Sequence, residues 1–334
     1  MKKLFVTIPD GDVKDTFIPD EVKTYMEQNF EVTYNSYGRN MTKAELRECL
    51  SDFDAVLTGW GTEKLDESVL GGNDRLKLIV HTGGTVGNLV DDYAYNRGIK
   101  VYSGNIMYAT SVAEGTIAYM LMALRRIPEY LNVVKSGGWR TEGDMWEGLL
   151  DRSVGIVGLG TISRIVIRML QCFNVKIKVF SHYEIEQEFL DKYNCVRASL
   201  EEIFATCDIV SVHSALNDEN RNLIRKEHLE LLKDGSLFIN TSRGPVVNEN
   251  DLITELNKNH FRAVLDVFDK EPLDNNHPFR TMENVYAIPH MAGPTLDRRK
   301  HITRALVDEA TAFFEGSIES EFEISESMAK RMTK

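Results

Sequence analysis

The chain has few of the residues that mark disulfide-bonded, metal-binding, membrane or nucleic-acid-binding proteins. It contains 4 cysteines in 334 residues, and their spacing fits no metal-ligand pattern. No apolar run is long enough for an export signal or a membrane span. Lysine and arginine number 39 against 51 aspartates and glutamates, and the formal charge of −12 argues against nucleic acid as a partner. We therefore expect a cytoplasmic protein whose thiols are reduced, at Cys49, Cys172, Cys195 and Cys207.

Strand-like and helix-like segments alternate along the first part of the chain. A length of 334 residues exceeds one hydrophobic core, and a hydrophobic content of 43% supports compact folding. Strands are expected at Leu4–Ile8, Glu31–Tyr34, Ala55–Trp60, Leu76–His81 and Lys100–Tyr102, with helices around Glu21–Gln28, Lys43–Leu50, Glu67–Leu70 and Leu89–Asn96. Thr42 and Glu45 have the spacing of a capping box. This alternation predicts a parallel sheet with right-handed crossovers, a complete smaller domain.

A second apolar strand runs directly into two glycines at Val154–Gly160. Gly158 allows a tight turn, and Gly160 lets backbone N–H groups approach a pyrophosphate at the start of the next helix. That helix is predicted from apolar residues at three- and four-residue spacing, Ile162, Ile165, Val166, Met169, Leu170 and Phe173. Ser163 replaces the third glycine of the dinucleotide fingerprint. The turn alone therefore fits a dinucleotide site and an ordinary strand–helix turn about equally well.

Three residues further along suit the reduction of a 2-oxo acid. Arg243 offers a planar, two-pronged grip on a carboxylate. His290 changes charge near neutral pH and suits proton donation to the forming alkoxide, while Glu271 suits pairing with its second ring nitrogen. Singly, they also fit a surface cation, a solvated loop carboxylate and a hydrogen-bonded loop histidine. All three are expected at strand ends, where doubly wound sheets bind ligands, and this convergence favours the catalytic interpretation.

Asp266 lies within the apolar run Ala263–Phe268, where a buried carboxylate needs a partner. Two partners are open to it. One is the carboxamide of a nicotinamide, which we favour because the strand ends at the predicted site, and the other is a nearby backbone turn that Asp266 would cap.

Six blocks of sequence follow one another in a distinctive order: Ser111–Glu114, Val154–Gly160, Cys207–His213, Asn240–Glu249, Ala263–Pro272 and Ile288–Pro294. In this order they resemble the D-2-hydroxyacid dehydrogenase family over nearly the whole chain. The resemblance implies an α/β protein of two doubly wound parallel-sheet domains, with a Rossmann cofactor domain inserted in a flavodoxin-like substrate domain. We expect the substrate domain at 1–103, the cofactor domain at 104–294, and a C-terminal helix and tail at 295–334 that return to the first domain.

The sequence pattern predicts two further helices. One runs from Ser111 to about Arg126 and leads into the cofactor domain. The other runs from Thr295 to Phe314, and the resemblance implies that it packs back on the first domain. The polar stretch from Ser317 is left without a role.

The resemblance also implies roles for single residues. Arg243, Glu271 and His290 match the family's catalytic triad, and no metal is expected. The loop Thr82–Gly87 matches the loop that grips the substrate carboxylate, although Val86 replaces its second glycine. Substrate contacts are therefore expected at Gly84, Thr85 and Val86 as well as Arg243, and cofactor contacts at Gly158, Gly160, Thr161, Ile162, Ser181, His213, Thr241 and Asp266.

Trp60 and His81, at two strand ends near that loop, are candidates for the side-chain pocket. Core packing explains Trp60 equally well.

Cofactor choice depends on the residue that ends the strand Val175–Phe180. A carboxylate there normally bonds the ribose hydroxyls of NAD and repels the extra phosphate of NADP. This chain has Ser181 and His182 instead, with Glu184 nearby and no arginine in the segment. Ala215 is a further departure, where the family usually has proline. We expect weak discrimination, with NAD slightly preferred and NADP also accepted.

The function predicted is hydride transfer between a nicotinamide cofactor and a D-2-hydroxy acid/2-oxo acid pair, in an enzyme that related proteins suggest is a homodimer. The alternative is a protein that senses NAD(H) and acts through partners, as the corepressors that share this fold do. The intact set of Arg243, Glu271 and His290 favours the enzyme.

Overall fold

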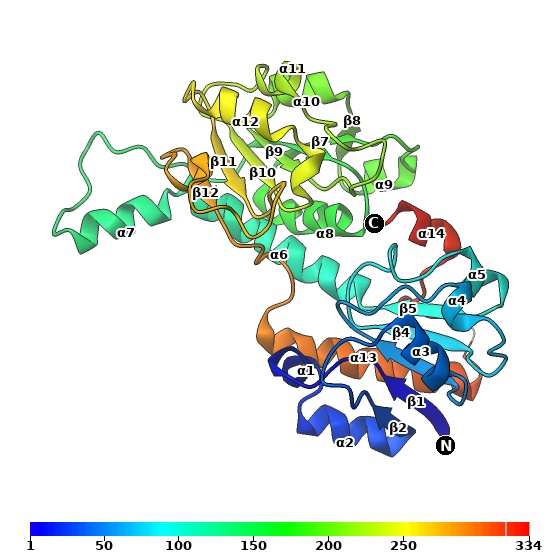
Figure 1. The fold of residues 1–334 in the computed structure, drawn as a ribbon. Coiled ribbons are helices and arrows are strands. Elements are labelled where there is room, and N and C mark those ends of the chain that lie inside the picture. Colours follow the sequence, from blue (N-terminus) through cyan, green and yellow to red (C-terminus); the bar gives the residue numbers. More distant parts are fainter. Residues whose placement is uncertain (318, 334) are drawn as a thin grey trace. The chain divides into compact units, whose positions relative to one another are not determined.

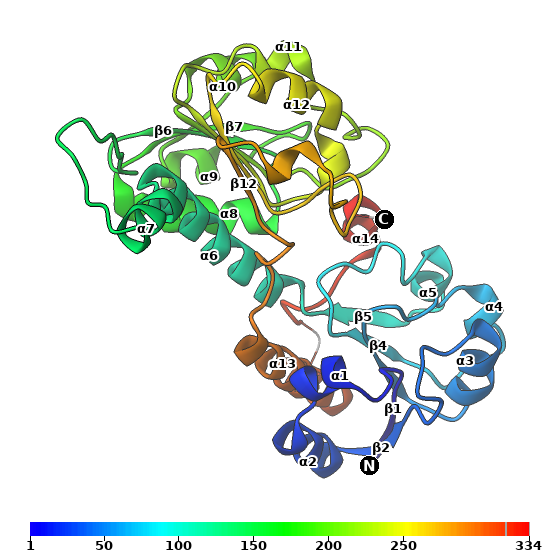
Figure 2. The same ribbon diagram turned by 60° about the vertical axis from the view of Figure 1, so that its left-hand side comes forward.

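The computed structural model describes residues 1–317 and 319–333 and divides into two compact units. The first unit comprises Met1–Ala109 and Pro294–Lys334, and the second comprises Thr110–Gly293. Each unit is built on one parallel sheet with helices on its faces (Figures 1 and 2). In the described part of the chain no helix combines the length and the apolar character needed to cross a bilayer.

The first unit has a five-stranded parallel sheet of order β2-β1-β3-β4-β5. This is the order of flavodoxin-like folds, as predicted. The strands are β1 (Lys2–Val6), β2 (Phe30–Tyr34), β3 (Ala55–Thr58), β4 (Leu78–His81) and β5 (Lys100–Ser103). The helices are α1 (Asp12–Phe17), α2 (Asp20–Asn29), α3 (Lys43–Leu50), α4 (Glu67–Leu70), α5 (Asp92–Asn96), α13 (Leu296–Glu315) and α14 (Glu326–Arg331).

Alternating strand residues bury both faces of this sheet. On one face Leu4, Val6 and their neighbours pack against α1, α2 and α13. On the other, Phe5 and Val56 pack against α3, α4, α5 and α14. The C-terminal helix α13 thus packs in the core of the first unit. The predicted Thr42–Glu45 capping box of α3 is present with both of its hydrogen bonds.

The second unit has a seven-stranded parallel sheet of order β12-β11-β10-β9-β6-β7-β8. Read from β8, it follows the Rossmann order 3-2-1-4-5-6 with one further strand, which confirms the fold class. The strands are β6 (Ser153–Val157), β7 (Lys176–Phe180), β8 (Cys195–Arg197), β9 (Ile209–Val212), β10 (Leu237–Asn240), β11 (Arg262–Leu265) and β12 (Val285–Ala287). The α-helices are α6 (Asn105–Leu124), α7 (Ile127–Lys135), α8 (Thr161–Leu170), α9 (Gln187–Lys192), α10 (Leu200–Thr206), α11 (Lys226–Leu229) and α12 (Glu249–Leu256), with 3-10 turns at Gln171–Phe173, Gly244–Val246 and Pro278–Arg280.

Helices α6 and α1 are among those that differ from the sequence predictions. Helix α6 begins at Asn105 rather than at Ser111, because the Ser103 hydroxyl accepts the Asn105 backbone N–H at 3.2 Å and starts the helix early. Serine is a common N-cap residue, but Ser111 lies in the interior of α6. Helix α1 was not predicted, since its short sequence is polar apart from Val13 and the buried Phe17.

The C-terminal tail, left without a role by the sequence, covers the edge of the first sheet. Glu323 forms an antiparallel bridge with Tyr102 of β5, and the Ile324 N–H donates to the Val101 carbonyl at 2.8 Å. Lys100 and Glu323 form an ion pair at 2.6 Å. The tail therefore satisfies edge groups of β5 that would otherwise stay unpaired.

Candidate active site

The glycine turn after β6 has the conformation that a dinucleotide-binding turn needs. Gly158 has a φ of 97°, and a Cβ placed on it would lie 2.7 Å from the backbone nitrogen of Ser214. The predicted helix follows as α8, and Ser163 is fully buried at the position of the third glycine. Its hydroxyl accepts the Gly160 N–H at 2.8 Å. A small polar residue therefore permits the close helix–strand packing that glycine usually allows.

The N-terminus of α8 is open to an anion. A Cβ on Gly160 would meet no heavy atom within 4 Å among those described, and the cap at Gly160 offers no side-chain acceptor to the first turn, where Thr161 and Ile162 lie. Backbone N–H groups at a helix start carry partial positive charge. These residues fit the pyrophosphate of a dinucleotide. The nicotinamide ring of that dinucleotide supplies the hydride when the cofactor is bound.

Three other predicted cofactor residues lie at strand ends of the same sheet. Ser181 follows β7, is buried, and accepts the Tyr183 N–H at 3.1 Å. His213 follows β9 and lies 2.9 Å from the Ser211 hydroxyl; burial lowers its pKa to about 4, so it is neutral at pH 7. Thr241 follows β10, and its hydroxyl contacts that of Thr116 at 3.1 Å.

The loop after β10 fixes Arg243 through its neighbours. The Asn240 side chain accepts the Ser242 N–H at 3.0 Å and donates to the Arg243 carbonyl at 3.0 Å. Arg243 Nη1 donates to the Ser242 carbonyl at 2.6 Å. Burial lowers the pKa of the Arg243 guanidinium, and the nearby charge of Glu271 opposes the shift. Sequence reasoning missed Asn240, although a strand-ending Asn is a common turn former.

Glu271 and His290 form a hydrogen-bonded pair at the ends of two neighbouring strands. His290 Nδ1 and Glu271 Oε2 are 2.6 Å apart, and the other carboxylate oxygen accepts the Phe268 N–H at 3.0 Å. Their side chains are 49% and 35% exposed. His290 has a φ of 51°, held by N–H donation to the Asp266 and Ile288 carbonyls. A carboxylate on Nδ1 selects the tautomer and leaves Nε2 free to exchange a proton.

Asp266 is buried and has the partners that its position required. Its carboxylate accepts the backbone N–H groups of Met291 at 2.7 Å and Ala292 at 3.0 Å, and the Tyr119 hydroxyl at 3.2 Å. Burial raises its pKa, and the two N–H donors oppose that shift. These contacts are those of the backbone-capping alternative. Asp266 thus holds the two residues after His290, while its role toward the cofactor stays a prediction.

The predicted substrate loop of the first unit is held mainly by its own unit. The Gly84 carbonyl accepts Asn105 Nδ2 at 2.9 Å, and the Thr85 hydroxyl donates to the Thr333 carbonyl at 2.9 Å. Val86 is fully buried in the core, so only its backbone can reach a ligand.

Trp60 and His81 have different surroundings. Trp60 is 47% exposed and lines a cavity of about 310 Å³ with Phe17 and Thr82. His81 is buried and bonds the Thr58 hydroxyl at 2.9 Å, which makes it a core residue rather than a pocket residue.

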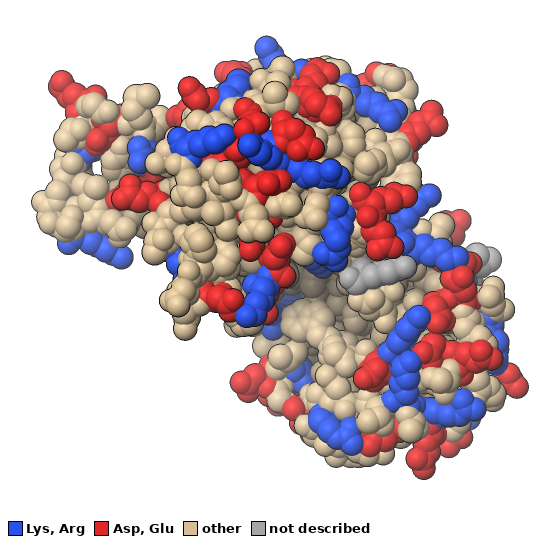
Figure 3. All heavy atoms as spheres, turned by 45° about the horizontal axis from the view of Figure 1, so that its top comes forward, with Lys and Arg blue, Asp and Glu red and all other residues tan. Residues whose placement is uncertain are grey.

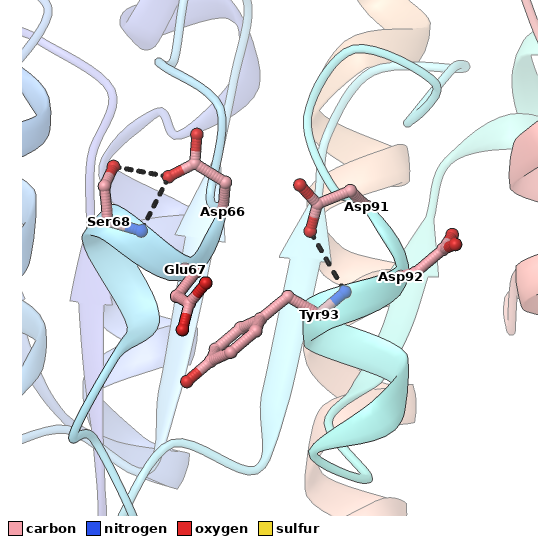
Figure 4. Close-up of a pocket in the computed structure, with 6 residues that line it drawn as sticks. All are labelled: Asp66, Glu67, Ser68, Asp91, Asp92 and Tyr93. Carbon is pink, nitrogen blue, oxygen red and sulfur yellow. Dashed lines mark hydrogen bonds between the residues drawn. The ribbon is translucent and has the colours of Figure 1, made fainter.

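A second hollow in the first unit is acidic but structural. Figure 4 shows Asp66 and Asp91 turned back onto the first turns of α4 and α5, where they cap Ser68 and Tyr93. Lys43 pairs with Asp66, and Lys64 with Asp91 at 3.1 Å. Acidic and basic side chains also alternate over the face drawn in Figure 3. Asp66 and Asp91 therefore have partners within the fold.

Comparison with known proteins identifies the family. Residues 117–292 match the model of the D-isomer specific 2-hydroxyacid dehydrogenase NAD-binding domain. The chain belongs to this family. It is 31% identical to a glyoxylate reductase of Thermofilum pendens, over 86% of each chain. It is 30% identical to a glyoxylate/hydroxypyruvate reductase B of Enterobacter sp. (strain 638), covering 90% of this chain and 94% of that one.

Solved structures share the fold at lower identity. A phosphoglycerate oxidoreductase from Rhizobium etli superposes with a TM-score of 0.80 at 22% identity, covering 97% of this chain and 99% of that one. As a member of the family, the chain is an NAD-dependent oxidoreductase that transfers hydride between the cofactor and a D-2-hydroxy acid/2-oxo acid pair, with NADP as a second possible cofactor. The relatives named are reductases, and nothing among them favours the corepressor-like alternative.

The two turn glycines offer a matched test of the cofactor site. Gly158→Ala should lower the free energy of unfolding by about 1–3 kcal/mol, because its φ is positive and the methyl group meets Ser214. Gly160→Ala should fold normally and bind NADH at least tenfold more weakly, because its methyl group fills space open to the pyrophosphate. Urea unfolding measures the stability of each variant, and NADH fluorescence titration measures its cofactor affinity. Unchanged NADH affinity in Gly160→Ala would move the pyrophosphate away from this turn.

The Asp266 contacts predict a positioning role. In Asp266→Asn, the amide N–H₂ group faces one of the two backbone N–H donors, and that hydrogen bond is lost. We therefore expect the free energy of unfolding to fall by about 1–3 kcal/mol. We also expect kcat to fall about tenfold or more as the loop of His290 shifts. Tyr119→Phe removes only the third contact and serves as the milder control. Full kcat in a folded Asp266→Asn enzyme would show that the loop keeps its place without the carboxylate.

Proposed function

We propose that this dehydrogenase reduces a short 2-oxo acid of the glyoxylate and hydroxypyruvate class, with Arg243, Glu271 and His290 as its catalytic residues. The observation that carries the proposal is the 2.6 Å pair of His290 and Glu271 on the sheet edge that also bears Arg243. The activities printed for the related reductases support the substrate class. A formal charge of −12 repels anions at long range, so binding an acid requires a local cation.

Each residue has one task in this reaction. Arg243 holds the substrate carboxylate through paired N–H donors. His290 Nε2 donates a proton to the carbonyl oxygen as hydride reaches the carbon, and it takes the proton back in oxidation. Glu271 bonds Nδ1, which orients the ring so that Nε2 faces the substrate.

The test is oxidation of NADH and NADPH with glyoxylate, hydroxypyruvate, pyruvate and phenylpyruvate, followed by variants of the pair. His290→Ala should lose about 10²–10⁴-fold in kcat, because the proton donor is gone. NADH affinity should stay within severalfold, since backbone groups around Gly158 and Gly160 form that site. Glu271→Gln should keep more activity than His290→Ala, because the proton donor is still present and only the hydrogen bond that orients its ring is weakened.

A second histidine–carboxylate pair in the same unit supplies the control. His277 Nε2 lies 3.1 Å from Glu249 Oε1, outside the proposed triad. His277→Ala should therefore lose far less kcat than His290→Ala. Wild-type inactivity with every acid would favour the binding-protein alternative, and a fully active His290→Ala enzyme would remove this residue from the mechanism.

We also propose that the enzyme is a cytoplasmic homodimer that pairs through α7 and the loop after it. This segment projects from the second unit (Figures 1 and 2) and exposes large apolar side chains. They are Ile127, Leu131 and Val134 on α7, and Trp139, Met145, Trp146 and Leu150 after it. An apolar patch with two tryptophans is typical of a protein interface. The free cysteines are in keeping with a reducing compartment.

Charge on this patch should separate the subunits. Light scattering after gel filtration should give twice the chain mass of 38.0 kDa for the wild type, and one chain for the double variant Leu131→Glu, Val134→Glu. Val196→Glu, at a similarly exposed residue on β8, should stay dimeric. A monomeric wild type, or a dimeric α7 variant, would place any interface elsewhere.

A further inference from the structure

The end of β7 is where a Rossmann domain reads the adenosine ribose of its dinucleotide. In this chain the position is Ser181, whose hydroxyl accepts the Tyr183 N–H at 3.1 Å and keeps its own proton to donate. A hydroxyl here neither bonds the two ribose hydroxyls as a carboxylate does nor repels a phosphate. The site therefore lacks the usual selection against NADP.

The structure adds a cation that the segment around Ser181 does not contain. Arg197 ends the neighbouring strand β8, where it is in register with Val179 of β7. Its Nη2 lies 3.5 Å from the Ser181 carbonyl oxygen, which brings the guanidinium to the end of β7. Ser181 and Arg197 are 16 residues apart in the sequence, and the pairing of β7 with β8 brings them together.

Arg197 keeps its charge available, unlike the other cations nearby. Lys178 of β7 pairs with Glu202 at 2.6 Å, and Arg164 of α8 pairs with Glu186 at 2.6 Å. Arg197 is exposed and, within residues 1–317 and 319–333, has no carboxylate oxygen within 4.0 Å. Because no described carboxylate occupies Arg197, its planar fork can bind a phosphate.

The acidic side chains of this region reduce the local positive potential, but none of those described forms an ion pair with Arg197. Glu186 is taken by Arg164, and Glu184 and Glu188 are exposed to solvent. At physiological salt, charges beyond about 8 Å are largely screened, so a direct Arg197–phosphate contact outweighs them.

We propose that Arg197 and Ser181 form a subsite for the 2′-phosphate of NADP(H), so that the enzyme binds NADPH more tightly than NADH, in contrast to the slight preference for NAD expected from the sequence. The inference deepens the cofactor assignment and concerns one subsite of it. Arg197 supplies two N–H donors and the charge, and the Ser181 hydroxyl supplies a third donor.

Ligand binding tests this subsite without turnover. Calorimetry should show wild-type enzyme binding 2′,5′-ADP at least tenfold more tightly than 5′-ADP, and Arg197→Gln should lose about tenfold for 2′,5′-ADP and NADPH while NADH stays within twofold. Ser181→Asp should abolish the preference by repulsion and strengthen NADH binding. Arg168→Gln removes one exposed arginine from the last turn of α8 and should change neither ligand.

The outcomes separate this inference from the proposed function. Binding of NADH with no gain from the 2′-phosphate, or an unchanged ratio in Arg197→Gln, overturns the subsite and leaves the dehydrogenase standing. Equal loss of NADH and NADPH in Arg197→Gln, with an unchanged melting temperature, also overturns it, because the arginine then serves the shared part of the cofactor. Failure of the wild type to bind NADH contradicts the cofactor site itself.

Discussion

Close backbone contact between the loops after β10 and β11 is the constraint on which the active site depends. A Cβ on Gly244 would lie 2.0 Å from the carbonyl carbon of Phe268, so only glycine lets these loops touch. Arg243 precedes that contact in one loop, and the Phe268 N–H in the other binds Glu271. The separation of Arg243 and Glu271 is thereby set by packed backbone, which moves less than side chains do.

Burial of polar groups performs the second half of this positioning. Asp266 lies next to the loop of His290 and accepts hydrogen bonds from two of its N–H groups, which would otherwise lack acceptors. The same loop forces His290 into a left-handed conformation that few non-glycine residues adopt. Strain of this kind persists where surrounding contacts over-determine it. Here the His290 N–H donates both to the Asp266 carbonyl, just after β11, and to the Ile288 carbonyl in its own loop.

Much of this arrangement follows from local sequence pattern. Buried strands, the glycines at 158 and 160, and the capping box at Thr42 each leave a signal within a few residues, and all appear in the structure. The pairing of Glu271 with His290 follows from chemistry, since a histidine acid benefits from a carboxylate on its second nitrogen. Contacts between strands leave no such signal. Arg197 reaches Ser181, and Tyr119 reaches Asp266, only because the sheet brings distant segments together.

The C-terminal tail shows how a loop predicted from its glycines can depend on residues far along the chain. The loop Thr82–Gly87 resembles an anion-binding turn, yet its hydroxyl at Thr85 bonds the Thr333 carbonyl. A Cβ on Gly87 would lie 2.7 Å from that same oxygen. Met332 packs in the core that contains Val86, so side chain and backbone of the tail fix the loop together. Glycine at position 87 is thus explained by close packing of the tail against the loop.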